Sequence, residues 1–479
     1  MAGQPDFLTV AQVASLLKLS QPDTWKLVGQ LGFPLPVRDE EGHDRWSQRA
    51  VEQWAGRRGH LMANPYKLKD LRPPPTPRPY LGLRIIEDYA VLSWDTEYGE
   101  ICLVYPAHPS FYHKSSKILR LLSHAFSILL VGPDWGFTGK TLQEFSPADP
   151  EYSNLPSWAE LKRALGYPAP FWPTALQDHD LMMRWVPGSP TIMGRAQNSL
   201  DEKLLLRLAN AYQEDDPVSV TLRHFVSRIR YQAMKSAEWE LSHWEKYEDF
   251  KDVTFPVKPI PEPEPSPVPS LEIRRQAWAK IGARTDELAA QCIDETKGWI
   301  DKKILSFSSV TQLIPGNSTI VDNWLESLCE TPWCAEFVWL GASSDDILLR
   351  DPLTNLPAYR ANDGRYFAAV PQKLPSTSPL QSIVLDKDVW ICTYDGRTYL
   401  APGGSDGITA TWGYSGTGPS YLASLFNCLL DDIASSTFFI DSQRRQIPNG
   451  LLALAMEKHP DGTIFSRQDL VKIKQQYIE

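Results

Sequence analysis

Cysteine is scarce in this sequence, and its few cysteines are widely spaced. Only Cys329 and Cys334 lie near each other, and no further Cys or His accompanies them at the spacing of a zinc site. We therefore expect reduced thiols in a cytoplasmic protein, with no disulfide framework, no metal and no cofactor. The six cysteines are Cys102, Cys292, Cys329, Cys334, Cys392 and Cys428.

Long apolar runs and positive net charge are also missing. No stretch approaches the roughly 20 apolar residues that cross a bilayer, and no basic flank begins the chain, so neither a membrane segment nor a secretory signal is expected. The formal net charge is −10. An acidic chain of this kind cannot coat nucleic acid through a broad basic surface, and any contact with DNA must be local.

The composition is that of a globular protein of several domains. Hydrophobic residues make up 42% of the 479 residues and charged residues 22%, and a chain of this length exceeds what one core supports. Two proline-rich stretches, 72–79 and 255–269, favour extended spacers, although either one could also be the ligand of a proline-reading partner. We expect an α+β protein with segments 1–60, 61–80 (basic and proline-rich), 81–250, 251–270 (proline-rich) and 271–479.

The capping residues and apolar spacing of the first sixty residues predict a small unit of three helices and a hairpin. Thr9 and Gln12 are spaced as a capping box, and Ser20 is a second N-cap. In the second helix Trp25, Val28 and Leu31 are expected to point inward. A polar turn at 39–42 follows between two short strands, and Ser47 caps a third helix whose inward residues are Val51 and Trp54.

This series of motifs resembles the AlpA and excisionase branch of MerR-type winged helix-turn-helix domains. The resemblance covers residues 7–58, and the segments that carry it are 8–20, 25–28, 33–38, 45–46 and 51–54. It implies a DNA-binding regulator or recombination factor of a phage or mobile genetic element. The fold class is then a winged helix-turn-helix followed by two mixed α/β modules separated by a proline-rich spacer.

The resemblance also implies where double-stranded DNA would be contacted. The second helix would enter the major groove, and the wing arginines would meet the backbone. The expected contact residues are Thr24, Lys26, Gln30, Arg38, Arg45, Arg57 and Arg58. Further basic residues up to Arg78 could add contacts to the phosphates.

The charge of this unit departs from the family pattern. Residues 1–60 hold seven Lys or Arg against seven Asp or Glu, and the wing tip is Asp39-Glu-Glu. A carboxylate near a phosphate is repelled, which weakens binding to DNA. A winged helix that docks protein instead of DNA is therefore the alternative.

Three other motifs are similar to those of NTPases, nucleases or nucleic-acid tracks, and each has a second interpretation. The segment 136–141 approaches a phosphate-binding loop but has Asp134 where a glycine is required. Asp95 and Glu97 follow a strand, as the carboxylates of two-metal nucleases do, and Asp178 and Asp180 are conceivable partners. An ordinary hairpin turn would have the same residue types at 95–97. Basic and aromatic residues between 223 and 239 could track nucleic acid or form a solvated helix face.

A glycine-rich segment near the C-terminus is the second candidate site. Residues 389–434 resemble an uncharacterised module of mobile-element proteins, which implies no activity. The loop could present free amides to an anion or could simply be a close-packing turn. The candidate anion-binding residues are Gly413, Ser415, Gly416, Thr417 and Gly418.

Three functions remain open at this point. The first is a DNA-binding protein of a mobile element, acting in transcription regulation or recombination, whose larger modules bind a protein partner, self-associate or sense a ligand. The second is a nucleic-acid-processing enzyme, a nuclease or NTPase of replication or phage defence. The third is a subunit of a larger nucleoprotein complex in which the winged helix docks protein.

Overall fold

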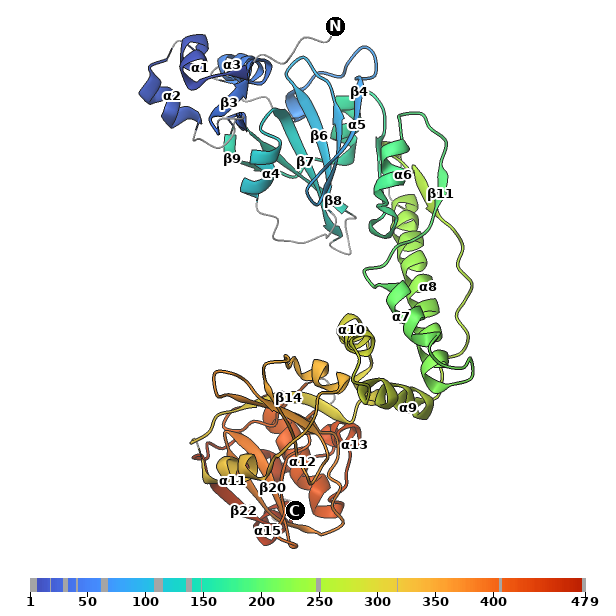
Figure 1. Cartoon of the computed structure of the whole chain (residues 1–479), viewed down its shortest axis with the longest axis vertical. Coiled ribbons are helices and arrows are strands. Elements are labelled where there is room, and N and C mark those ends of the chain that lie inside the picture. Colours follow the sequence, from blue (N-terminus) through green and yellow to red (C-terminus); the bar gives the residue numbers. More distant parts are fainter. Residues whose placement is uncertain are drawn as a thin grey trace. The chain divides into compact units, whose positions relative to one another are not determined.

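The computed structural model describes eleven stretches of the chain, which fall into two units (Figure 1). One unit comprises residues up to 198 together with 228–264, and the other comprises 199–227 and 265 onward. The expected α+β organisation in several pieces is confirmed. The described residues are 7–17, 19–28, 33–39, 42–61, 68–106, 115–134, 140–147, 149–246, 251–316, 318–404 and 407–475.

Both proline-rich stretches, which were expected to be extended spacers, take part in packing. Leu68 and Leu71 are buried, and Pro74 and Pro77 lie beside Gly166. Arg78 is buried as well. Its Nε donates to the carbonyl oxygen of Ala164 at 2.7 Å, and its Nη1 lies 2.6 Å from Glu97. Arg78 is therefore not available to a phosphate.

The N-terminal elements run strand, helix, helix, strand, strand, helix. Their strands form an antiparallel sheet in the order β1-β3-β2. Thr9 and Gln12 form the predicted reciprocal caps, with Gln12 N–H donating to Thr9 Oγ1 at 3.2 Å and Thr9 N–H to Gln12 Oε1 at 2.8 Å. The bounds are β1 (Phe7–Leu8), α1 (Val10–Leu17), α2 (Gln21–Val28), β2 (Val37–Arg38), β3 (Asp44–Ser47) and α3 (Gln48–Leu61).

A single small core holds these elements together. Trp46 of β3 lies at its centre with 2% of its surface exposed. The residues packed with it come from both helices, the intervening loop and α3, which explains why six short elements stay together. The core comprises Val13, Leu27, Phe33, Trp46 and Val51.

The inward face of α2 differs from the predicted one. Thr24 and Leu27 are buried, whereas Trp25 is 55% exposed. The prediction placed the largest apolar residue inside, but this core is already filled by Trp46 and Phe33. The helix is therefore rotated by about one residue from the expected orientation.

A six-stranded sheet dominates the rest of the first unit. Its strands follow chain order, and all neighbours are antiparallel except β6 and β7, which are parallel and joined through α4. The bounds are β4 (Tyr80–Ile86), β5 (Tyr89–Trp94), β6 (Glu100–Pro106), α4 (Ser115–Leu121), β7 (Ala125–Asp134), β8 (Lys140–Ser146) and β9 (Asp149–Asn154).

Alternation along the strands gives this sheet two buried faces. Val91 and Val104 pack with α4 on one face. Leu92 and Leu103 pack on the other face with α5 (Trp158–Leu165) and with the second half of α8 (Pro217–Lys246). Because both faces are covered, the central strands read as apolar runs.

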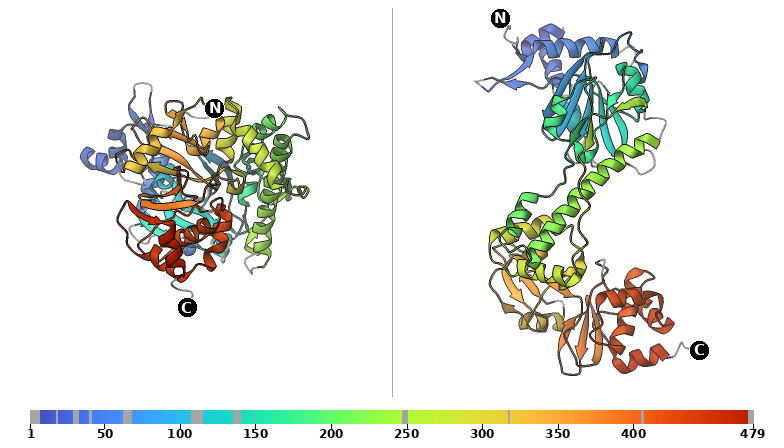
Figure 2. Two further views of the ribbon diagram at one scale, coloured as in Figure 1. Left: turned by 90° about the horizontal axis from the view of Figure 1, so that it is seen from below. Right: turned by 90° about the vertical axis from the view of Figure 1, so that its right-hand side faces the viewer.

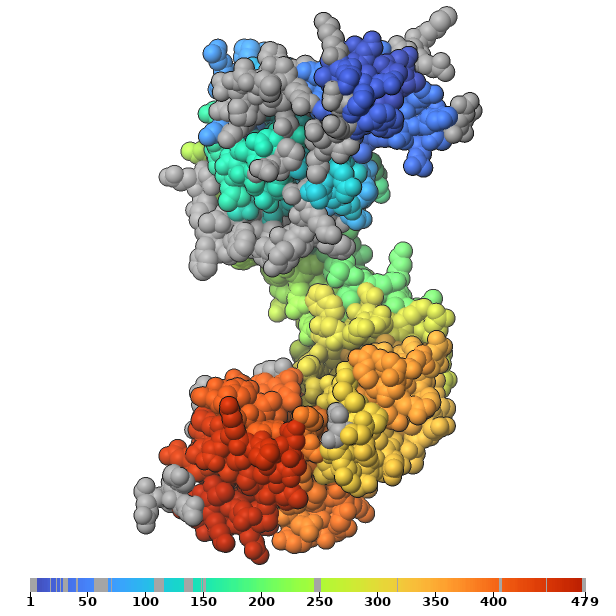
Figure 3. Space-filling model, turned by 90° about the vertical axis from the view of Figure 1, so that its left-hand side faces the viewer, coloured from blue at the N-terminus to red at the C-terminus, as the bar shows by residue number. Residues whose placement is uncertain are grey.

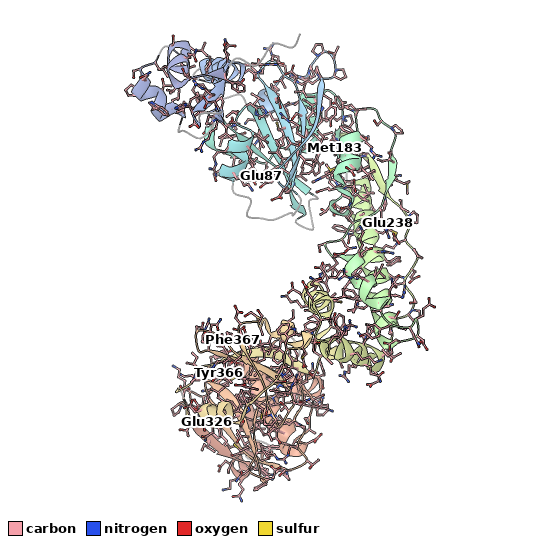
Figure 4. The ribbon with its side chains drawn as sticks, in the orientation of Figure 1. Glu87, Met183, Glu238, Glu326, Tyr366 and Phe367 are labelled. Carbon is pink, nitrogen blue, oxygen red and sulfur yellow. The ribbon has the colours of Figure 1, made fainter. Side chains whose placement is uncertain are left out.

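The long helix α8 comprises 30 residues, and Figure 2 shows it as one uninterrupted helix. Its Glu238, labelled in Figure 4, pairs with Lys235 at 2.8 Å, and Arg223 donates to the side chain of Asn210. These contacts favour an ordinary helix surface over the nucleic-acid track.

The neighbouring elements are β10 (Ala169–Pro170), α6 (His179–Arg184), β11 (Ile192–Gly194), α7 (Glu202–Ala209), β12 (Val253–Thr254) and β13 (Val257–Pro259).

β12 directly precedes the second proline-rich stretch, and β13 lies within it. β12 pairs in parallel with β10, and β13 with β11, so residues 253–259 belong to the packed body of the first unit. The hydrogen bonding to β11 extends to Ile260, whose N–H donates to the carbonyl oxygen of Gly194 at 2.8 Å.

The described residues of the second unit form two sheets. The five-stranded sheet has the order β14-β18-β17-β16-β15, and the four-stranded sheet the order β21-β20-β19-β22. Phe367 of β18, labelled with Tyr366 in Figure 4, stacks on Tyr359 at 4.9 Å between ring centroids. The bounds are β14 (Phe307–Leu313), β15 (Cys329–Glu330), β16 (Ile347–Arg350), β17 (Pro357–Arg360), β18 (Tyr366–Pro371), β19 (Leu380–Asp386), β20 (Asp388–Thr393), β21 (Thr398–Leu400) and β22 (Thr463–Ser466).

The C-terminal helices cover the four-stranded sheet and form the larger core of this unit with it. Leu422 and Phe426 of α12 pack with Ile383 and Ile391 of the sheet. Figure 3 shows the surface of these C-terminal residues in red and orange. The helices of the unit after α8 are α9 (Leu271–Gly282), α10 (Glu287–Thr296), α11 (Thr319–Ser327), α12 (Thr417–Asp431), α13 (Thr437–Ser442), α14 (Asn449–Met456) and α15 (Arg467–Gln475).

Candidate nucleic-acid interface

Thr24 does not belong to the outer surface of α2. Its side chain is fully buried, and Oγ1 donates to the carbonyl oxygen of Ser20 at 2.9 Å. A buried hydroxyl that is satisfied within its own helix cannot reach DNA without unfolding the helix. The expected contact by Thr24 is therefore wrong, and its role is to pack α2.

The outer face of α2 is formed instead by Gln21, Pro22 and Trp25, all of which are exposed. The indole of Trp25 offers a large apolar surface with one N–H donor, and such surfaces contact thymine methyl groups, sugars or another protein. The side chain of Lys26 and all of Gln30 lie outside the described residues.

Arg38 is the exposed cation of the hairpin. Its side chain is 81% exposed, and its Nε lies 3.7 Å from Asp44 Oδ1 across the two strands. An exposed pair of this length is weak, so Arg38 can exchange the carboxylate for a phosphate at little cost. Arg38 is thus an accessible cation on the hairpin.

Arg45 is held more tightly, because its Nε donates to Asp39 Oδ2 at 2.8 Å and both side chains are partly buried. The other oxygen of Asp39 accepts the His43 N–H at 2.8 Å, and Gly42 closes the turn at a φ of +82°. Asp39 thus organises the hairpin and is balanced by Arg45. This pairing lessens the repulsion that the acidic tip would exert on DNA, but it also occupies Arg45.

Arg57 and Arg58 lie in α3, and their side chains are outside the described residues. His108 and His113, which flank an aromatic pair in the sequence, lie outside them as well.

The phosphate-loop interpretation does not fit the backbone around it. Asp134 ends β7 and Lys140 begins β8, and these two residues are paired in one antiparallel hairpin. A phosphate-binding lysine instead opens a helix, whose N-terminal amides surround the phosphates. A Walker-type site is therefore wrong here.

The carboxylates at 95–97 are arranged as a turn. Thr96 Oγ1 donates to the carbonyl oxygen of Gly99, and Glu97 pairs with Arg78, whose guanidinium lowers the pKa of the Glu97 carboxyl. Asp178 caps α6 by accepting the Leu181 N–H at 2.9 Å. Throughout the described stretches, no three His, Cys, Asp or Glu side chains gather as metal ligands.

The glycine-rich loop before α12 is closely packed. A Cβ on Gly416 would lie 2.7 Å from the ring of Tyr414, and one on Gly418 would lie 1.9 Å from Thr411 Oγ1. Gly413 has a φ of +90°. Close packing thus accounts for these glycines, while Ser415 and Thr417 are exposed. Anion binding here stays a prediction.

We expect Gly418→Ala to lower the free energy of unfolding of the second unit by about 2 kcal/mol, because the added methyl group overlaps Thr411. Urea unfolding of the full chain measures the change. Gly298→Ala is the matched control, since a Cβ there meets nothing within 4 Å. Equal stability of the two variants would contradict the packing account.

Within the described residues, no helix is both long and apolar enough to cross a membrane. Comparisons with protein-family models, with curated proteins and with solved structures find nothing that matches this chain.

Proposed function

We propose that residues 7–61 are a winged helix-turn-helix that binds double-stranded DNA locally, and that the chain is a DNA-binding protein of a mobile genetic element. The outer face of α2 would enter the major groove, and Arg38 would contact the backbone from the hairpin. The order of two helices, a hairpin and a third helix around Trp46 supports this proposal. The observation that carries it is the exposed Arg38 on that hairpin.

In this proposal the larger modules bind a protein partner or mediate self-association. The alternative that a specific observation favours is protein docking by the N-terminal unit. Trp25, Leu35 and Val37 are all more than half exposed in that unit. Exposed apolar side chains at this density also suit a protein interface.

A salt titration tests DNA binding against protein docking. Fluorescence anisotropy of a labelled duplex with the full chain should show an affinity that falls as salt rises, because bound cations displace counterions. In Arg38→Gln the slope of log K against log salt should shrink by about 0.9, the value of one phosphate contact.

Arg360→Gln is the charge-matched control, because Arg360 is an exposed arginine of the second unit at the end of β17. Its salt slope should equal that of the unchanged protein. If the unchanged protein does not bind duplex at low salt, or if both variants share one slope, the proposed role of Arg38 is refuted.

A further inference from the structure

The second unit contains a cavity of about 900 Å³. It lies among α9, the 3₁₀ helix η5 (Ala335–Leu340), the start of β14 and the end of β16. Cavities that bind small molecules have volumes of roughly 300 to 1,000 Å³ and are lined mainly by apolar and aromatic side chains with a few polar groups. The size therefore suits one small molecule, and the residues of the lining indicate the chemical class of that molecule.

Aromatic side chains form much of the cavity lining. Trp278 of α9 is buried and contacts Trp339 of η5 edge to face, with 5.8 Å between ring centroids. Trp333 stacks on Phe337 at 6.2 Å, and this contact orients the indole that lines the cavity. Flat rings held by such contacts provide surfaces on which a planar ligand can stack without a large loss of side-chain entropy.

The charged groups Arg350 and Glu336 of the cavity lining are paired with each other. Arg350 Nη2 lies 3.0 Å from Glu336 Oε2, and Arg350 Nη1 donates to the carbonyl oxygen of Asn355 at 2.6 Å. Burial raises the pKa of the Cys334 thiol, and Glu336 adds to the effect, so this thiol stays protonated. The interior therefore offers a neutral ion pair and an unreactive thiol.

Two further cations lie at exposed positions of the lining. The Nε of Arg275 donates to the carbonyl oxygen of Lys303 at 3.0 Å, which leaves the terminal guanidinium nitrogens for other partners. Lys373 makes no ion pair with any residue that the structure describes, and its side chain is exposed. The lining thus has three cationic side chains and one carboxylate, in a chain whose overall charge is −10.

We propose that this cavity binds a small anionic molecule with a flat aromatic body. The aromatic rings receive the body of the ligand, and Arg275 and Lys373 receive its negative charge. The neutral Arg350–Glu336 pair fixes the shape of the interior between them. This site is independent of the proposed DNA contact.

A pair of probes that differ in one charged group tests the proposal on the full chain. The anion 1-anilinonaphthalene-8-sulfonate carries a sulfonate, and N-phenyl-1-naphthylamine has the same rings without it. We expect one sulfonate probe per chain, with energy transfer from tryptophan, and binding about tenfold tighter than for the neutral probe, as two exposed charge contacts allow.

Reversal of the two exposed charges locates the site. R275E/K373E should weaken binding of the sulfonate probe by about tenfold, because attraction becomes repulsion, and leave the neutral probe within about twofold. The matched control R360E/K472E has the same charge change at exposed residues outside the lining and should leave both probes unchanged. If the double variant does not fold by circular dichroism, K373Q replaces it, with an expected loss of about threefold.

Three results would overturn the proposal: no saturable binding of the sulfonate probe, equal affinity for the two probes, or equal loss in the two charge-reversed variants. Each would show that the exposed cations do not select an anion at this cavity.

Discussion

Trp46→Ala should unfold residues 7–61 and abolish DNA binding by the full chain. Trp46 is the largest side chain of that small core. It comes from the hairpin and packs in one cluster with residues of α1, α2 and α3. Replacement of a buried tryptophan by alanine costs about 3–5 kcal/mol. A unit of this size has only about that much stability to lose. Duplex binding by anisotropy and hydrogen exchange of residues 7–61 measure the two consequences.

Trp25→Ala is the matched control for stability, since the same side chain is removed from an exposed position. Hydrogen exchange of this variant should remain close to that of the unchanged protein. A Trp46→Ala protein that retains its exchange protection would show that Trp46 is not central to the core. Loss of protection without loss of duplex binding would place DNA binding outside residues 7–61.

Glu144→Ala should have a comparably large effect on the first unit. Glu144 is buried in β8, where its Oε1 accepts the Leu68 N–H at 2.8 Å and the Ser127 hydroxyl at 2.9 Å. Its Oε2 accepts the Tyr152 hydroxyl at 3.1 Å. Removal of the carboxylate leaves the buried donors of Leu68 and Ser127 without this acceptor, with an expected loss of about 3 kcal/mol or more in the free energy of unfolding.

Urea unfolding of the full chain, followed by hydrogen exchange of β7 and β8, measures this loss. Glu144→Gln should retain much of the stability, because an amide oxygen still accepts from Leu68 and Ser127. Glu326→Ala, at an exposed position of α11 labelled in Figure 4, should leave stability unchanged. A Glu144→Ala protein as stable as Glu326→Ala would contradict the account.

The exposed Arg38 and the compact order of elements favour a DNA reader, whereas the exposed Trp25 also suits a protein partner. The salt slope separates the two, since an apolar interface responds little to salt and a phosphate contact responds strongly.

Local sequence signals determined the ends of elements and the order of the N-terminal unit. The Thr9–Gln12 capping box and the turn at 39–42 depend on residues a few positions apart, so their chemistry can be read directly from the chain. The α+β class followed from changes in apolar periodicity for the same reason.

Tertiary structure alone decided which of these residues remain accessible. Thr24 is buried and Trp25 is exposed, the reverse of the expectation, because Trp46 and Phe33 from other elements fill the core. Arg78 became buried by contacts with Ala164 and Glu97, and the cavity beside Trp278 joins segments more than a hundred residues apart. Such contacts depend on the packing of distant segments, which no local pattern in the chain specifies.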